Sequence, residues 1–403
     1  MPSESAPSRG RRVVSLTPLA VDRDSRTFKQ AASVARMGLE SVLVEGQESR
    51  LDPERLPFAL RTVRSEPRRR APLVARYVAE LVRTHARDLY VVMLRLWHYG
   101  AVTARTVPPA SLYYLHSPLQ YPAVLLRGRG RARFVYDAHD FYPADRTDEL
   151  WDRLLTWLER RCVRDAAEVV TVTDGCAQLI EEFFGRRPVV IPNVHDPRID
   201  EPPSADLRTA LGLDADAFLV VMVGNAKPGT AVEEALEALA ALPDRVHLAF
   251  VGGGWEAYAA CIDERGLGSR VHLHPPVPPA QIAPLISTAD AAVILYVPLT
   301  HDYLHALPNR FFLPISAGLP LIYPESLNEI RALAREHELG IGFDPRRPAT
   351  LATAIDRLLG DDRALRAYRA NVRQAAETLS WERVEPRLQA LIEASLNGAG
   401  TRR

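Results

Sequence analysis

Cysteine is scarce in this sequence, and the three that occur form no cluster. Cys162, Cys176 and Cys261 are too few and too scattered among 403 residues for a disulfide framework or a zinc site. Long hydrophobic runs are also missing, because no stretch reaches the roughly 18 apolar residues of a membrane-spanning helix. The first residues, MPSESAPSRGRR, lack the apolar centre of a signal peptide. We therefore expect a cytoplasmic protein with a disordered leader over residues 1–11.

Charge of one sign is not in excess either. The 50 basic and 50 acidic side chains give a formal net charge of zero, so total charge does not suggest a nucleic-acid-binding protein. The sequence is 47% hydrophobic and 25% charged, which is typical of a globular protein. At this length we expect about two domains.

Short apolar segments alternate with helical segments in the first half, which predicts an α/β domain with a parallel sheet over residues 12–195. The helix at 27–40 lies between two such strands and ends near Gly38. Ligands collect at the carboxyl ends of parallel strands, here residues 14–26, 115–118, 137–143, 173–175 and 192–196. Strands are expected within 11–18, 41–46, 88–95, 111–118, 133–140, 167–174 and 188–193.

The second half repeats the α/β pattern after a polar, proline-containing linker at 196–206. A second Rossmann-like domain is expected over 207–374, with a helix at 230–242 and a final helix at 375–397. Its strands are expected within 218–229, 247–254, 270–277, 291–298 and 319–324.

The segment 303–322, YLHALPNRFFLPISAGLPLI, is the most informative part of the chain. Pro308 ends the preceding segment, and Asn309 occupies a position where a helix cap is expected. Gly318 is suited to the left-handed conformation that ends many helices. A helix N-terminus beside Arg310 predicts a diphosphate site.

This segment resembles the PNK-helix-AAGLP element of family-four-like retaining glycosyltransferases with the GT-B fold. DAHDFYP at 137–143 resembles a strand-end segment of the same family, and the loop at 21–31 resembles the one after its first strand. The likeness covers about residues 12–397. It implies two Rossmann-like domains with the active site in the cleft between them, and a last helix that crosses back to the first domain.

The resemblance assigns roles to residues of the first domain. His139 would help to hold the donor sugar, although a strand-end histidine can equally bond to backbone. The residues on the acceptor side would be Asp22, Asp24, Arg26, His116 and Asp140. For Asp24, a purely structural role as a helix cap remains an equal alternative.

In the second domain the resemblance implies a diphosphate held by Lys227 and Arg310, which are the expected catalytic residues together with His139. A lysine in a turn can also be merely exposed. The backbone at Gly224 would approach the phosphates closely. The donor-binding residues would be Gly224, Asn225, Lys227, Val277, Pro308, Asn309, Arg310 and Phe311.

The sequence departs from the family where two glutamates usually contact the nucleotide ribose. Leu313 and His305 stand at those two positions, and Thr230-Ala231 replaces the usual basic residue and glycine. Loss of an acceptor for the ribose hydroxyls could cost about 1–3 kcal/mol of donor binding. An altered donor, a substitute carboxylate such as Glu325 or Glu329, and an inactive homologue all remain open.

Arginine-rich segments at 64–70 and 127–133 indicate either a solvated surface or attraction to an anionic acceptor or membrane. We expect no bound metal or other cofactor, since the Asp-x-Asp pair at 22–24 is not a metal motif in this fold. No nucleic-acid partner is expected.

The expected activity is transfer of a sugar from a nucleotide-sugar to a hydroxyl acceptor, with retention of the anomeric configuration. Two alternatives stay open. A non-catalytic homologue that binds a ligand or partner is supported by Leu313 and Thr230. A sugar-nucleotide epimerase has the same fold but needs carboxylates and histidines that cannot be assembled from this sequence.

Overall fold

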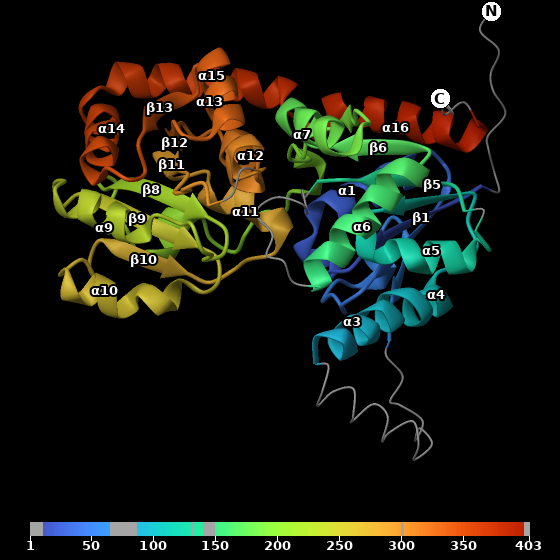
Figure 1. Ribbon diagram of the computed structural model, residues 1–403. Coiled ribbons are helices and arrows are strands. Elements are labelled where there is room, and N and C mark those ends of the chain that lie inside the picture. The colour runs from blue at the N-terminus through green and yellow to red at the C-terminus, as the bar shows by residue number, and fades with distance from the viewer. Residues whose placement is uncertain (1–10, 65–86, 131, 140–149, 300–301, 399–403) are drawn as a thin grey trace, which may run out of the picture. The chain divides into compact units, whose positions relative to one another are not determined.

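The computed structural model describes residues 11–64, 87–130, 132–139, 150–299 and 302–398. Contacts divide the chain into two compact units (Figure 1). The N-unit comprises the chain to Ile191 together with the segment from Glu385 onward, and the C-unit comprises Pro192–Val384. The expected linker at 196–206 thus lies inside the C-unit. None of the described helices combines the length and apolar character needed to cross a membrane.

The N-unit is built on a seven-stranded sheet in the order β3-β2-β1-β4-β5-β6-β7, with every pairing parallel. Its core strands are nearly free of exposed residues because helices cover both faces of such a sheet. The strands are β1 (Arg12–Thr17), β2 (Glu40–Glu45), β3 (Ala59–Thr62), β4 (Leu112–Leu115), β5 (Phe134–Asp137), β6 (Glu168–Thr171) and β7 (Val189–Val190).

The N-unit helices include α1 at Ser25–Arg36, which begins two residues before the expected helix and ends before Gly38. The strand expected at 88–95 is wrong, since α3 occupies Arg87–Trp97. An apolar run of this length fits a buried strand or a helix equally well, and no turn residue interrupts it before Gly100. Other described helices of this unit are α4 (Thr103–Thr106), α5 (Tyr121–Arg127), α6 (Leu150–Asp165) and α7 (Asp174–Phe184).

The C-unit has a six-stranded parallel sheet in the order β10-β9-β8-β11-β12-β13. Its central strand β8 (Phe218–Val223) is buried at every residue. The other strands are β9 (Val246–Val251), β10 (Val271–His274), β11 (Ala291–Val293), β12 (Leu321–Pro324) and β13 (Gly340–Phe343). The helices are α8 (Leu207–Ala210), α9 (Val232–Ala240), α10 (Ala259–Glu264), α11 (Pro279–Ile286), α12 (Asn309–Ser316), α13 (Asn328–Glu336), α14 (Pro348–Gly360) and α15 (Asp362–Thr378).

The last helix, α16, occupies Trp381–Asn397, so the expected helix at 375–397 is in fact divided at residues 379–380. Its first residue belongs to the C-unit, where the Trp381 amide donates to the His195 carbonyl oxygen. From Glu385 onward it belongs to the N-unit, where Glu385 accepts from Arg36 Nε at 2.6 Å.

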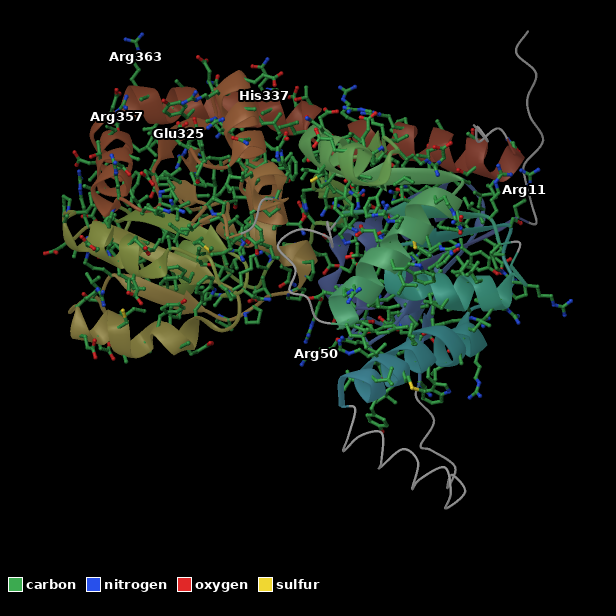
Figure 2. The ribbon with its side chains drawn as sticks, in the orientation of Figure 1. Arg11, Arg50, Glu325, His337, Arg357 and Arg363 are labelled. Atoms are coloured by element: carbon green, nitrogen blue, oxygen red, sulfur yellow. The ribbon has the colours of Figure 1, made fainter. Side chains whose placement is uncertain are left out.

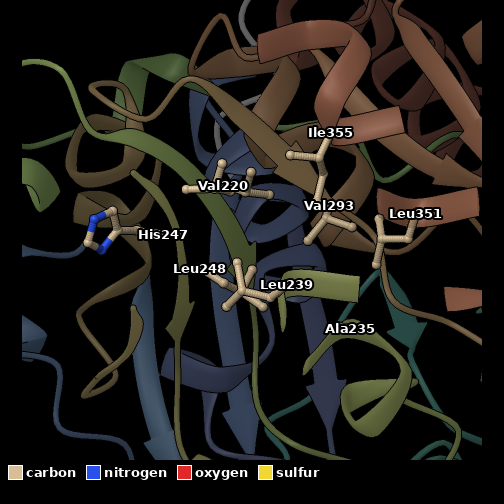
Figure 3. A pocket seen from close by; sticks show the side chains of 9 residues that line it. Val220, Ala235, Leu239, His247, Leu248, Val293, Leu351 and Ile355 are labelled. Atoms are coloured by element: carbon tan, nitrogen blue, oxygen red, sulfur yellow. The ribbon is translucent and has the colours of Figure 1, made fainter. Parts of the chain in front are cut away.

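The core of the C-unit contains a small void of about 10 Å³ beneath α9 and α14. Figure 3 shows apolar side chains around it, among them Leu239, Val293 and Ile355. A void of this size holds about one water at most, and its walls offer almost no polar partner. We interpret it as imperfect packing of the core and not as a ligand site.

Candidate functional sites

Asp137, the last residue of β5, is the centre of a buried polar cluster in the N-unit. Its Oδ2 accepts from Arg26 Nε at 2.8 Å and from Gln30 Nε2 at 2.7 Å. The Arg26 side chain is only 2% exposed, and its Nη1 also donates to the Ile191 carbonyl oxygen. Arg26 therefore lies in the interior and ties α1 to the sheet, although the sequence predicted it on the acceptor side.

Two histidines lie beside the Asp137 carboxylate. His116 follows β4, and its Nδ1 is 3.7 Å from Asp137 Oδ2. His139 follows β5, with its Nδ1 3.7 Å from Asp137 Oδ1. His116 is fully buried, whereas the His139 side chain is 24% exposed. Only His139 can therefore touch a ligand from solvent without rearrangement. Asp140 lies outside the described residues.

Burial and charge set the protonation of this cluster. Burial alone would raise the pKa of Asp137, but the Arg26 guanidinium and the two imidazoles outweigh it and hold the pKa well below its usual range. Burial also lowers the pKa of His116 to about 4, against the attraction of Asp137 and Asp24. At neutral pH the cluster thus holds an ionised carboxylate, a charged guanidinium and a neutral His116.

A metal ion is a conceivable occupant of this cluster. The ligand atoms of His116, Asp137 and His139 all lie within 4.8 Å of one another. However, Asp137 Oδ2 is already engaged by Arg26 and Gln30, and the fixed positive charge of Arg26 repels a second cation at the same carboxylate. We interpret the cluster as a buried ion pair flanked by imidazoles.

The two aspartates of the loop at 21–31 both accept backbone hydrogen bonds. Asp24 caps the helix, because its Oδ1 accepts from the Thr27 amide at 3.0 Å and its Oδ2 accepts from Thr17 Oγ1 at 2.7 Å. Asp22 accepts from the Arg50 amide at 3.0 Å. The structural role that the sequence left open for Asp24 is present. Whether either residue also contacts an acceptor stays a prediction.

The C-unit holds a second cluster, which we call the Arg310 cradle: Gly224, Asn225, Lys227, Tyr296, Tyr303 and Arg310. The Arg310 guanidinium lies 4.4 Å from the centre of the Tyr296 ring and donates to the Asn225 carbonyl oxygen at 2.8 Å. Lys227 Nζ lies 4.6 Å from the centre of the same ring and 5.5 Å from that of Tyr303. Two cations thus share one tyrosine.

The backbone conformation at Gly224 makes room for the arginine. Gly224 has a φ of +110°, and a Cβ there would stand 2.8 Å from Arg310 Nη2. The Gly224 carbonyl oxygen accepts from Trp255 Nε1 at 2.9 Å, which fixes the loop after β8. Any larger residue at 224 would displace the guanidinium, so this glycine is required by close approach as well as by its φ.

The cradle is cationic and partly buried. Arg310 makes no ion pair with a carboxylate in the part of the chain that the structure describes. Burial lowers the pKa of its guanidinium, which nevertheless stays charged because the reference value is so high. Burial raises the pKa of Tyr296 to about 12, so its phenol stays neutral. An anion would balance the charge of the Arg310 guanidinium.

Two residues of α12 differ from expectation. Asn309 is not the helix cap, because α12 begins at Asn309 itself and Pro308 takes the cap position. The Asn309 Oδ1 instead accepts from Asn193 Nδ2 at 3.0 Å. Phe311 is fully buried against Phe312, with ring centres 5.1 Å apart, so its side chain packs the core and cannot line a donor site. Val277 is half-buried in the loop after β10.

Glu325 and Glu329, the two carboxylates proposed to replace the missing ribose-binding glutamates, have different surroundings. Glu329, in the first turn of α13, lies with its Oε1 3.5 Å from His305 Nδ1. Glu325, labelled in Figure 2, pairs with Arg335 at 2.7 Å. Leu313 is half-buried on α12. Of the two carboxylates, Glu329 is thus the one placed beside a position where the family usually has a glutamate.

Sequence reasoning missed Tyr296 of the cradle and the amide of Gln30. Tyr296 lies against Lys227 and Arg310, and Tyr303 lies against Lys227, so both arrangements depend on contacts between segments far apart in the sequence. A tyrosine pair with this spacing carries no recognisable motif. Gln30 stands one turn after Arg26 in α1, and helical spacing of polar residues on a buried face is the signal that could have found it.

Both halves of the chain match models of known families. Residues 24–194 match the glycosyl transferase 4-like domain, and residues 217–361 match glycosyl transferases group 1. Among curated relatives, a D-inositol 3-phosphate glycosyltransferase of Thermomonospora curvata is 27% identical over 57% of this chain and 57% of its own length. The α-D-kanosaminyltransferase of Streptomyces kanamyceticus is 28% identical over 55% of this chain and 58% of its own.

Solved structures resemble the whole chain in fold. Sucrose-phosphate synthase from Thermosynechococcus elongatus matches with a TM-score of 0.69 at 18% identity, over 96% of this chain and all of its own. Anabaena HepE, solved in complex with UDP-glucose, matches with a TM-score of 0.69 at 15% identity, over 95% of this chain and 99% of its own.

The fold is therefore the two-sheet GT-B fold, as the sequence predicted. The two matched ranges, one for a glycosyl transferase 4-like domain and one for glycosyl transferases group 1, together cover most of the chain. The matches to curated relatives span less than two thirds of those proteins' lengths.

Proposed function

We propose that this protein transfers a sugar from a nucleotide-sugar to a hydroxyl acceptor and retains the configuration at the anomeric carbon. The observation that carries the proposal is the Arg310 cradle, where Arg310 and Lys227 share the ring of Tyr296 and Arg310 has no carboxylate partner among the described residues. A nucleoside diphosphate would supply the missing negative charge. HepE, a structural neighbour, is a protein solved with UDP and with UDP-glucose, which supports this class of donor.

The mechanism follows from the charges of the cradle. As the bond between sugar and diphosphate breaks, negative charge grows on the leaving phosphate. Arg310 and Lys227 stabilise that charge. Because both side chains are already held against Tyr296 before the reaction, they do not have to move as the charge develops. In the mechanism that we propose, no protein side chain acts as the nucleophile. The leaving phosphate oxygen therefore accepts the acceptor's proton on the same face of the sugar, which gives retention without a covalent intermediate.

His139 contributes a partly exposed imidazole to the sugar-binding side of the N-unit, and its ring is held next to the carbonyl and carboxylate of Asp137. In this mechanism the diphosphate is neutralised by side chains and needs no metal ion. The arginines at 127, 129 and 133 would attract an anionic membrane surface, where a lipid-linked or surface acceptor would be found.

The first experiment is a thermal-shift titration of the full chain with UDP, GDP, ADP and dTDP and with their sugars. A ligand that binds only the folded state raises Tm by mass action. We expect one nucleotide to give a clear shift at millimolar concentration and the matching nucleotide-sugar to be turned over. UDP is the first to test. An unchanged Tm with every nucleotide would favour the alternative of a non-catalytic homologue. The absence of both ribose-binding glutamates supports that alternative.

Replacing Glu329 with glutamine is expected to weaken donor binding about 5- to 100-fold with little change in kcat, because the ribose would lose a charged hydrogen-bond acceptor outside the reacting centre. Glu325→Gln is the matched control, since that carboxylate is paired with Arg335. The donor KM of both variants is the measurement. Equal KM values for the two would show that Glu329 does not replace the missing glutamates.

A further inference from the structure

The Arg310 cradle contains a second aromatic ring, Tyr303, to which the proposed function gives no role. The centre of this ring lies 5.5 Å from Lys227 Nζ and 6.1 Å from the centre of the Tyr296 ring, with the two ring planes at 79°. Among the described residues, cation–ring contacts join Lys227 to both tyrosines and Arg310 to Tyr296 alone. The two cations of the cradle therefore have different aromatic surroundings.

Lysine is rare in this chain, which makes the lysine at 227 informative. The sequence contains two lysines, Lys29 and Lys227, among 50 basic residues. Lys29 is buried in α1, so Lys227 is the exposed one of the two. A lysine ammonium is a compact charge on a flexible stem, and it needs neighbouring groups to hold it in one place. The faces of two aromatic rings supply such groups.

The two cations lie close enough to repel each other. Lys227 Nζ and Arg310 Cζ are 4.6 Å and 4.4 Å from one ring centre, so their separation cannot exceed these two distances together. Like charges at this range destabilise each other unless negative charge offsets the repulsion. The face of an aromatic ring carries partial negative charge, and Tyr296 presents its ring to both cations. The ring therefore offsets part of the repulsion before any anion binds.

The backbone around Tyr296 is held independently of its side chain. Thr230 and Tyr296 form an antiparallel bridge between the loop after β8 and the segment after β11. The Val297 amide also donates to the Gly229 carbonyl oxygen at 2.8 Å. These backbone bonds remain when the ring is replaced. The effect of such a replacement on Lys227 therefore reports on the ring and not on the loop.

We infer that Tyr296 and Tyr303 are positioning residues for the two cations of the cradle. Tyr296 holds Lys227 and Arg310 beside each other, and Tyr303 holds Lys227. The ring of Tyr296 has this role and its hydroxyl does not, because burial raises the pKa of Tyr296 to about 12 and the phenol stays neutral. Delivery of the positioned cations to a diphosphate rests on the proposed function, whereas their contacts with the rings do not.

The first test needs no ligand and uses the scarcity of lysine. Reductive methylation with isotope-labelled formaldehyde places NMR-visible methyl groups on lysine and keeps its charge. We expect the Lys227 methyl signal of the full chain to lie upfield, because the ammonium lies over ring faces, and Lys227→Ala identifies this signal. Tyr296→Leu and Tyr303→Leu should each move it towards the position of free dimethyl-lysine, and Tyr296→Phe should retain the upfield position. Tyr368→Leu, a half-buried tyrosine of α15, is the matched control.

The second test is a set of double-mutant cycles on the calorimetric Kd of UDP and of inorganic pyrophosphate. We expect Tyr296→Leu to weaken binding about 3- to 30-fold and Tyr296→Phe to restore most of the loss. Tyr303→Leu should cause no further loss in a Lys227→Ala background but its full loss in an Arg310→Ala background. A merely structural role of Tyr303 would weaken binding equally in both backgrounds.

The possible outcomes separate this inference from the proposed function. A Lys227 methyl signal that is not upfield, or that neither leucine variant moves, would overturn the positioning role. So would a Tyr296→Phe variant that binds as weakly as Tyr296→Leu, or equal losses from Tyr303→Leu in the two backgrounds. If neither a nucleotide nor pyrophosphate binds the unaltered chain, the proposed function fails instead, and the methyl signal alone decides whether the rings hold Lys227.

Discussion

Replacing Arg310 with alanine is expected to lower kcat for sugar transfer by about two to three orders of magnitude. The guanidinium is held by Tyr296 and by the Asn225 carbonyl oxygen, so it meets the diphosphate without having to be ordered first. Arg310→Lys should restore little of the loss, because an ammonium lacks the planar fork and does not stack on Tyr296 in the same way. Initial rates at saturating donor give kcat, and UDP titration gives Kd.

Arg331→Ala provides the control for this prediction. Arg331 lies in the same unit and donates to the Glu325 carbonyl oxygen and to Asn328, outside the cradle. Its loss removes one positive charge without touching Tyr296, and we expect near-normal kcat. A near-normal kcat for Arg310→Ala, in a protein with unchanged Tm, would remove Arg310 from the mechanism.

Breaking the buried ion pair by Arg26→Met is expected to cost about 3–5 kcal/mol of N-unit stability, because it leaves the Asp137 carboxylate buried without its charge partner. The paired change Arg26→Met with Asp137→Leu should recover part of this loss, since no buried charge then remains. Because a chain of two units need not unfold in one step, amide hydrogen exchange in β4 and β5 is the measurement.

The exposed pair Arg12–Glu40 is the matched control in the same sheet. Its side chains are 33% and 50% exposed, and removing one partner should cost less than about 1 kcal/mol. Equal costs for the two pairs would contradict the assignment of Arg26 to the interior.

The Arg26–Asp137 pair also predicts a dependence on pH. The pKa of Asp137 is lowered in the folded state, so its contribution to stability is fully present above the unfolded value of about 3.9 and is lost as pH falls below it. Asp137→Asn should therefore flatten the acid side of the stability curve. The fully buried His116, with its pKa lowered to about 4, adds a loss that begins earlier, as pH falls below about 6.5.

Much of the fold was predictable because its signals are local. The start of β1, the strand at 218–223 and the left-handed Gly318 after α12 each follow from a few neighbouring residues. Strands β3 and β13 were missed. β3 is an edge strand with alternating exposure, and β13 begins and continues with glycines, so neither shows the apolar run that marks the central strands.

The candidate site was less predictable, because its decisive contacts join segments far apart in the chain. Arg26 looked like a loop arginine suited to a ligand, yet its partner is 111 positions away at the end of β5. Lys227 was assigned to the diphosphate through the family likeness and Arg310 through that likeness and its place at a helix N-terminus, and both assignments stay predictions. Tyr296, which lies against both of them, could not be predicted. Contacts between a ring and cations from distant segments produce no recognisable residue spacing in the sequence.

Helix α16 begins in the C-unit and continues in the N-unit, which affects the order in which the two units can fold. The N-unit depends on residues that follow the C-unit in the sequence, because Glu385 pairs with Arg36 and Asn397 accepts from Arg11. Leu388 and Ile392, on the same stretch, are fully buried. During synthesis these residues leave the ribosome after the whole C-unit. The first unit to be translated must therefore be the last to complete its packing, and it waits with an uncovered apolar surface that chaperones can recognise.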